Sequence, residues 1–119
     1  MHNFKNIIAW QKARALVKEV YLLLKKFPKS ELHGLVSQIM RSVISIPSNI
    51  AEGNSRDSTR EYLHHLSIAV GSLAELETQL IIASRLGYCA AEETDSLLTR
   101  TKEIGRMISG LQRALKRKL

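Results

Sequence analysis

The central stretch from Ser45 to Gly53 gathers the residue types that could do chemistry in this chain. Two serines, an asparagine and Glu52 lie close to Pro47 there. A proline inside a helix removes one backbone hydrogen bond and crowds the carbonyl four residues earlier, so we expect the helix to bend at Pro47 or to end and restart. Short polar side chains can satisfy the backbone groups that are freed. The pattern favours a kinked helix end with local capping, closed by Gly53 in the left-handed conformation.

A second interpretation is a buried polar cluster that sets how the helices register. Glu75 lies on the same helix row as Ile68 and Ile82, which places a carboxylate among apolar neighbours, and Arg41 is a candidate partner for it. The members of this cluster would be Arg41, Ser45, Asn49, Glu52 and Glu75. A catalytic role is a third interpretation, and it lacks a paired acid and base because Glu75 and Glu77 face different directions on one helix.

Glu61 and His64 have the Glu-x-x-His spacing of a di-iron carboxylate site. Such a site needs two of these motifs together with a Glu from each of two other helices. This chain has a single motif, and Glu61 already completes a capping box with Ser58. We therefore expect no metal and no cofactor.

Other catalytic patterns are missing from the sequence as well. It holds no Gly-rich phosphate loop, no Ser-His-Asp set and no Cys-His metal spacing. Cys89 has no histidine near it in the sequence, which is typical of an idle thiol. His64 and His65 follow Arg56 and Arg60 and indicate a solvated basic edge. The sequence thus predicts a protein that is not an enzyme.

The composition is that of a small helical protein. The chain has 119 residues, of which 45% are hydrophobic and only 5% aromatic, enough for a single core, and we expect one domain over residues 1–119. No apolar run approaches the roughly 18 residues that span a bilayer. The N-terminus lacks the apolar core of a signal peptide, and one cysteine fits a reducing compartment. We expect a cytoplasmic protein with no membrane association.

Apolar residues recur in alternating steps of three and four along most of the chain, which is the spacing of one helix face. The pattern predicts helices over residues 8–26, 30–53 and 58–87, and a fourth from residue 90 to near the C-terminus. Ser30 and Ser58 are the expected N-caps, and Gly87 closes the third helix. Short loops make consecutive helices antiparallel, so the predicted fold is all-α, an antiparallel up-down-up-down four-helix bundle.

Some apolar residues of these helices lie outside the predicted core faces. We predict the faces Trp10, Ala13, Val17, Val20, Leu24 and Phe27 on the first helix, and Leu32, Val36, Ile39, Val43, Ile46 and Ile50 on the second. Contiguous apolar surface outside a core usually marks an interface. The predicted oligomer interface comprises Leu16, Leu23, Ile68, Ile81 and Ile82. A thicker core of the monomer is the alternative.

The formal net charge of +7 is concentrated in two segments. Residues 5–29 carry seven lysines and arginines with one acid, and residues 104–119 carry five with none. Cations in the last turn of a helix also suit the helix dipole, but two basic segments in one small domain favour a polyanion partner. The candidate nucleic-acid-binding residues are Lys25, Lys26, Lys29, Arg56, Arg60, Arg113, Lys116, Arg117 and Lys118.

Three segments resemble the 23S ribosomal RNA intervening-sequence protein family: residues 9–13 (AWQKA), residues 45–53 (SIPSNIAEG) with Arg56 just after, and residues 71–78 (GSLAELET) followed by Leu86-Gly87-Tyr88. The resemblance implies a four-helix bundle that assembles as a ring-like homo-oligomer, a pentamer. Members are encoded in sequences inserted in bacterial ribosomal RNA genes. A related branch is the accessory protein of diversity-generating retroelements, which works with a reverse transcriptase and RNA. One departure is Ala90-Ala91, where members tend to carry a polar cap.

Charge and resemblance together predict a non-enzymatic, basic, oligomeric protein that binds nucleic acid, either ribosomal or other structured RNA, or DNA. The alternative is a scaffold or accessory subunit that binds another protein, for example a reverse transcriptase. The two hypotheses differ in salt dependence, because phosphate contacts weaken steeply with salt and apolar contacts do not.

Overall fold

The structure is a computed structural model that describes residues 3–119. Four helices make up most of it: α1 (Ile8–Leu24), α2 (Leu35–Asn54), α3 (Thr59–Arg85) and α4 (Ala91–Lys116). Two short 3₁₀ turns, η1 (Phe4–Asn6) and η2 (Lys29–Glu31), precede α1 and α2. No strand occurs in the part of the chain that the structure describes. The predicted all-α four-helix bundle is confirmed.

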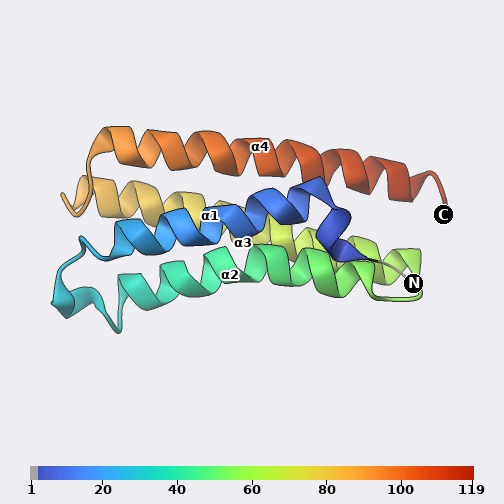
Figure 1. The fold of residues 1–119 in the computed structure, drawn as a ribbon, viewed down its shortest axis with the longest axis horizontal. Helices are drawn as coiled ribbons and strands as arrows, with labels where there is room; N and C mark the ends of the chain where they lie inside the picture. Colours follow the sequence, from blue (N-terminus) through green and yellow to red (C-terminus); the bar gives the residue numbers. More distant parts are fainter. Residues whose placement is uncertain (1–2) are drawn as a thin grey trace.

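The helices lie side by side in an elongated bundle that measures 46 × 24 × 20 Å. Figure 1 shows the sequence colours running in opposite directions along consecutive helices. Each helix packs on two others: α2 contacts α1 and α3, and α4 contacts α3 and α1. One end of the bundle therefore holds the end of α1, the start of α2, the end of α3 and the start of α4, and the other end holds both termini and the α2–α3 loop (Figure 1).

Four of the six residues predicted for the core face of the first helix are buried, namely Ala13, Val20, Leu24 and Phe27, and the core is wider than predicted. Leu16 and Leu23 are 0% and 5% exposed, so they belong to the monomer core and their assignment to the oligomer interface was wrong. Trp10 and Val17 from the predicted face are only half-buried. The physical reason is that residues 9, 13, 16, 20 and 23 also follow steps of three and four, and packing on both α2 and α4 buries this row together with most of the predicted one.

Helix α2 continues through Pro47 to Asn54, so the expectation that it ends and restarts at the proline is wrong. The helix ends where Ser55 N donates to Ala51 O. Gly53 does not take the left-handed conformation; it is helical and buried. A Cβ there would lie 2.8 Å from His65 Cβ, so glycine is needed for the close approach of α3.

The start of α2 also differs from the prediction. Ser30 does not cap it; η2 comes first, and Gly34 is the N-cap of a helix that begins at Leu35. Glu31 caps this start instead, because its Oε1 accepts a hydrogen bond from Leu35 N at 3.1 Å. Leu32, expected in the core, is 55% exposed because it precedes the helix.

The N-cap and the closing glycine of α3 match the expectation, but among the described residues the Glu61 carboxylate does not accept a hydrogen bond from Ser58 N, so the predicted capping box is only half formed. Ser58 Oγ accepts a hydrogen bond from Glu61 N at 3.0 Å, as an N-cap does. Gly87 has a φ of 82°, the left-handed conformation that closes a helix. The loop to α4 is closed by Glu93, whose Oε1 accepts a hydrogen bond from Ala90 N at 3.1 Å. Glu93 therefore satisfies the backbone N–H of Ala90, while the alanine side chain offers no acceptor to the first turn of α4.

Acid should weaken the end of the bundle where Glu31 lies. The hydrogen bonds from Leu35 N and from the Tyr88 hydroxyl, the latter at 2.8 Å, hold the pKa of Glu31 below its usual value. A carboxyl group whose pKa is lower in the folded state stabilises the protein at a pH above its unfolded-state pKa, which is about 4.3. This contribution is lost as the pH falls through the folded-state pKa. We expect Glu31→Gln to unfold at a lower temperature than the wild type at pH 7 and at nearly the same temperature at pH 3.

Circular dichroism at pH 7, 5 and 3 measures these unfolding temperatures. Glu92→Gln is the control, because Glu92 is exposed at the same end and loses the same charge. A gap between wild type and Glu31→Gln that stays constant from pH 7 to pH 3 would contradict this role of Glu31.

Candidate nucleic-acid interface

A row of hydrogen-bonded polar side chains runs along the contact between α2 and α3. This polar row consists of Ser42, Ser45 and Asn49 on α2 and of His65, Ser72 and Gln79 on α3. Ser42 Oγ donates to Gln79 Oε1 at 2.7 Å, and Ser72 Oγ donates to Ser45 Oγ at 2.8 Å. Ser42 and Ser72 are buried. Short side chains allow close helix approach, and paired hydroxyls favour one register over its neighbours.

Asn49 and His65 continue the polar row toward the α2–α3 loop. Asn49 Nδ2 donates to Ser45 O at 2.9 Å, and its Oδ1 accepts from His65 Nδ1 at 3.0 Å. The other ring nitrogen, Nε2, lies 3.8 Å from Glu52 Oε2. Glu52 in turn pairs with Arg56 through Nη2 at 2.7 Å. The polar row thereby extends from the bundle interior to a basic loop.

Two members of the expected polar cluster lie outside this row. Arg41 and Glu75 are exposed on the rim of a polar cavity, and no ion pair joins them within the described residues, so the expected buried pair is wrong. Glu52 is also at the surface, with a side chain that is 51% exposed. His65, expected on a solvated edge, is only 14% exposed. His65 lies within the α2–α3 contact, whereas Arg41 and Glu75 lie at its solvent-exposed edge.

The Glu61 and His64 side chains are both exposed. Among residues 3–119 no group of three or more His, Cys, Asp or Glu side chains is arranged to hold a metal ion. Cys89 is half-buried, with its Sγ 3.4 Å from Thr94 Oγ1.

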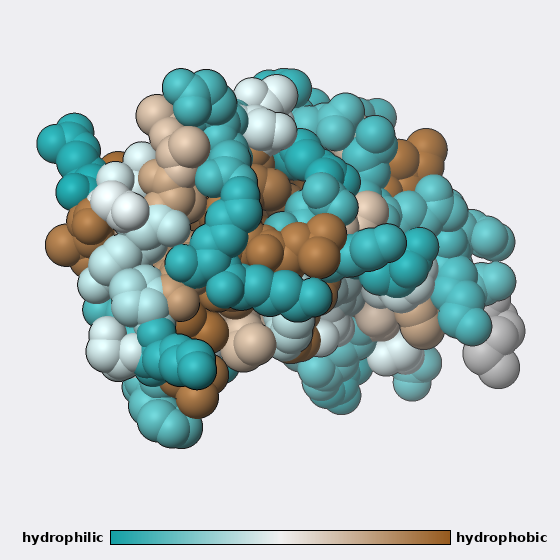
Figure 2. Space-filling view, turned by 60° about the vertical axis from the view of Figure 1, so that its left-hand side comes forward, coloured by the Kyte–Doolittle hydropathy of each residue, from teal (hydrophilic) through white to brown (hydrophobic). Residues whose placement is uncertain are grey.

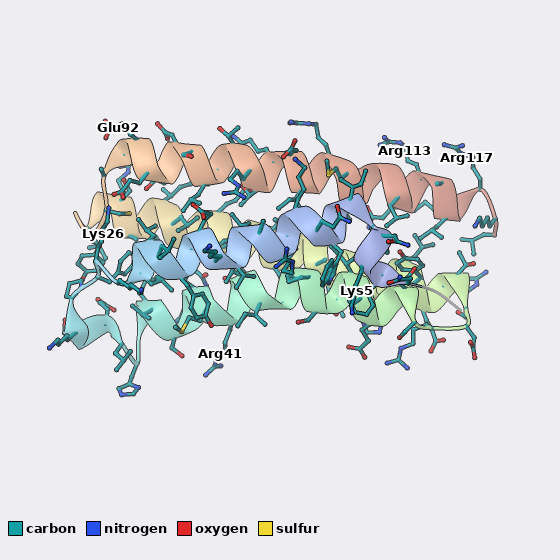
Figure 3. The ribbon with its side chains drawn as sticks, viewed as in Figure 1. Lys5, Lys26, Arg41, Glu92, Arg113 and Arg117 are labelled. Atoms are coloured by element: carbon teal, nitrogen blue, oxygen red, sulfur yellow. The ribbon has the colours of Figure 1, made fainter. Side chains whose placement is uncertain are left out.

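Six of the predicted nucleic-acid-binding residues lie at one end of the bundle. This basic end consists of Arg56, Arg60, Arg113, Lys116, Arg117 and Lys118. All six are exposed, and Figure 3 shows Arg113 and Arg117 projecting from the last turns of α4. The acids of the same end are Glu52, Asp57 and Glu61, and the last 16 residues contain no acid.

The α2–α3 loop and the end of α4 meet at a cavity of about 360 Å³, here called the end cavity. Arg56 and Lys118, far apart in sequence, both line it. Its walls also include Ile7, Tyr62, Leu111 and Leu115. Burial raises the pKa of Tyr62 above its usual value, so its hydroxyl stays protonated at neutral pH.

Lys25, Lys26 and Lys29 lie at the opposite end and are separated from the basic end by the length of the bundle (Figure 1). Lys26 forms an ion pair with Glu93 at the start of α4, and this contact lowers the pKa of Glu93. Lys25 and Lys29 are exposed. The structure therefore does not gather all nine predicted cations into one surface.

An apolar groove of about 550 Å³ runs between α1 and α2. Its floor includes Val17, Leu22, Ile44 and Pro47, and its charged lining residues are all basic: Arg14, Lys18 and Lys25. Figure 2 shows one face of the molecule, on which hydrophobic areas lie between hydrophilic side chains. This α1–α2 groove combines apolar surface with positive charge and has no acid among its lining residues.

The outward face of α3 is unusually apolar. Ile68, Val70, Ile81 and Ile82 are each between 39% and 44% exposed. Helix α3 is long and apolar enough to cross a membrane by length and composition alone, but its opposite face packs on α2 and α4. The structure leaves this α3 outer face uncovered, and three of the five predicted interface residues lie on it.

Comparisons with known proteins agree with this architecture. The family model described as 23S rRNA-intervening sequence protein matches residues 5–110. Among solved structures, the chain is similar to a protein of unknown function from the S23 ribosomal protein family of Bacteroides thetaiotaomicron, with a TM-score of 0.82 and 24% identity over 88% of this chain and 98% of that one. At this identity the likeness shows the fold. No curated protein matches the chain.

Proposed function

Because the chain belongs to the 23S rRNA-intervening sequence protein family, we propose that it is a non-enzymatic protein that binds structured RNA or duplex DNA through its basic end. The observation that carries the proposal is the meeting of Arg56 and Lys118 at one cavity, beside Arg113 and Arg117. Three elements thus contribute positive charge to one region, since α2, α3 and α4 all begin or end there.

Contacts to phosphate dominate in this proposal. Six flexible cations can neutralise backbone phosphates without reading base edges. Aromatic residues make up only 5% of the chain, so stacking on a string of bases is not available. The protein should therefore bind many sequences with similar affinity.

Self-association would multiply this site. We propose that the α3 outer face pairs protomers into a homo-oligomer, for which the family resemblance implies a pentameric ring. A ring repeats the basic end once per subunit. Several moderate sites on one particle then bind a long polyanion more tightly than any one of them.

The direct test is filter binding of ribosomal RNA, another structured RNA and duplex DNA at 50 mM salt. We expect retention of each with micromolar or tighter affinity. On duplex DNA, log affinity should fall against log salt with a slope of about −0.9 for each phosphate contacted. Absence of retention for all three would exclude the proposed function.

The α1–α2 groove supports a second candidate, a scaffold that binds another protein, for example a reverse transcriptase. An apolar floor with three cations around it suits an acidic, amphipathic partner. Binding through the groove would depend little on salt compared with phosphate contacts. The salt slope therefore separates the two candidates.

A further inference from the structure

We propose that the end cavity receives one unpaired nucleotide next to the end of a nucleic-acid duplex. The inference rests on the proposed function and adds a class of preferred substrate to it, a duplex with an unpaired terminal nucleotide. A volume of about 360 Å³ is near the lower limit of small-molecule sites, which start at about 300 Å³. The cavity therefore has room for a single nucleotide and none for a helix.

The interior wall of the end cavity suits the face of a base. Leu115 is 7% exposed, and Ile7 and Leu111 are half-buried against the core. These three side chains come from two segments: Ile7 lies between η1 and α1, and the other two lie on α4. When the flat face of a base enters here, that face is removed from water. Removing apolar surface from water lowers the free energy and so favours binding.

Tyr62 adds an aromatic ring and a polar group to the same wall. Its ring is held against α2, because a Cβ on Gly53 would lie 2.9 Å from Tyr62 Cδ1. Within residues 3–119 the Tyr62 hydroxyl has no hydrogen-bond partner, and it is not completely buried. The half-buried Asn54 lines the cavity as well. A hydroxyl and an amide can each donate to or accept from a base edge.

The rim of the end cavity can hold the phosphate. Lys118 is exposed and Arg56 uses Nη2 to pair with Glu52, which leaves its other N–H groups free to donate. Asp57 also lines the cavity and reduces the positive charge there. Glu52, which pairs with Arg56, offsets the remaining surplus of one cation. The positive charge at the rim therefore comes from the rest of the basic end that surrounds it. An apolar interior with a cationic rim matches a nucleotide that places its base inside the cavity and its phosphate at the rim.

The experiment compares three probes on the full-length protein: a blunt RNA duplex, the same duplex with one unpaired 3′ nucleotide, and free AMP. We expect the unpaired nucleotide to strengthen binding by at least about fivefold, the lower end of what one stacked base contributes. Equal affinity for both duplexes would overturn the inference while leaving the proposed function intact. Binding of free AMP as tight as that of the overhang duplex would overturn it too, since the ligand would then be a free nucleotide.

Two variants of cavity residues and one control test whether the unpaired nucleotide binds in the end cavity. Thr59→Trp should fill the end cavity and abolish the preference for the overhang over the blunt duplex, because Thr59 lines the cavity at the start of α3. Thr99→Trp, at an exposed position on α4 outside the cavity, is the matched control and should keep the preference. Tyr62→Phe removes only the hydroxyl and should reduce the preference about two- to tenfold, the effect of one hydrogen bond. A full preference in both cavity variants would show that the nucleotide binds elsewhere.

Discussion

Reversing the charge of Arg113, Lys116 and Arg117 together is expected to weaken binding to every nucleic-acid sequence alike and to flatten its salt dependence. Removing one cation that binds a phosphate should reduce the slope of log affinity against log salt by about 1, so the slope of the triple glutamate variant should fall by about 3. All three side chains are exposed on the last turns of α4. The core remains intact, and the glutamates replace favourable interactions with the helix dipole by unfavourable ones there.

The matched control reverses three exposed cations outside the basic end, Arg14, Lys18 and Arg41. Both variants have the same net charge, so a difference between them reports position. We expect the control to keep most of the salt slope. Fluorescence anisotropy with a labelled duplex at four or more salt concentrations gives both slopes. If the slope falls by the same amount in the two variants, binding depends on overall charge and the basic end has no special role.

Replacing Ile82 by glutamate is expected to convert an oligomer into a monomer of 13.4 kDa. The wild type should have several times that mass if the α3 outer face pairs protomers. Ile82 is 44% exposed in the monomer, so Ile82→Glu can fold with its carboxylate in water. In the assembly the same carboxylate would be buried without a partner, which costs several kcal/mol. Ile68→Glu, on the same face, should act in the same way.

Light scattering after gel filtration measures the mass of each variant. Ile44→Glu is the matched control, because Ile44 is 42% exposed but lies in the α1–α2 groove. It should keep the mass of the wild type. Dissociation by Ile44→Glu and not by Ile82→Glu would place the interface at the groove, and a wild-type mass of 13.4 kDa at micromolar concentration would rule out self-association.

Part of the candidate site follows from sequence and topology. In an antiparallel bundle the end of α2, the start of α3 and the end of α4 necessarily share one end, which brings Arg56 and Arg60 to the cations of residues 113–118. The same rule separates these from Lys25 and Lys29. The pairing of Lys26 with Glu93 follows too, since the end of α1 and the start of α4 coincide.

Two of the six residues of the polar row were predicted, Ser45 and Asn49. Ser42 on α2 was not expected there, and neither were His65, Ser72 and Gln79 on α3. These three residues are spaced by seven, which is the repeat of a helix face in a bundle, so a search for polar heptads would have found them. The burial of Glu75 and its pairing with Arg41 were predicted wrongly. Glu75 shares a helix row with Ile68 and Ile82, and that row is exposed in the monomer.

By itself the sequence determined four helices, their approximate bounds and their antiparallel order, because apolar spacing, caps such as Ser58 and loop lengths are local properties. Only the tertiary structure decided that Leu16 and Leu23 also enter the core while Val17 stays half-buried, because these residues fit the same helical periodicity and differ only in the neighbours they meet. It also decided that α2 passes through Pro47, since packing on both sides outweighs the loss of one backbone hydrogen bond. The end cavity depends on Ile7, the α2–α3 loop and side chains of α3 and α4 meeting in space, and no local pattern contains that information.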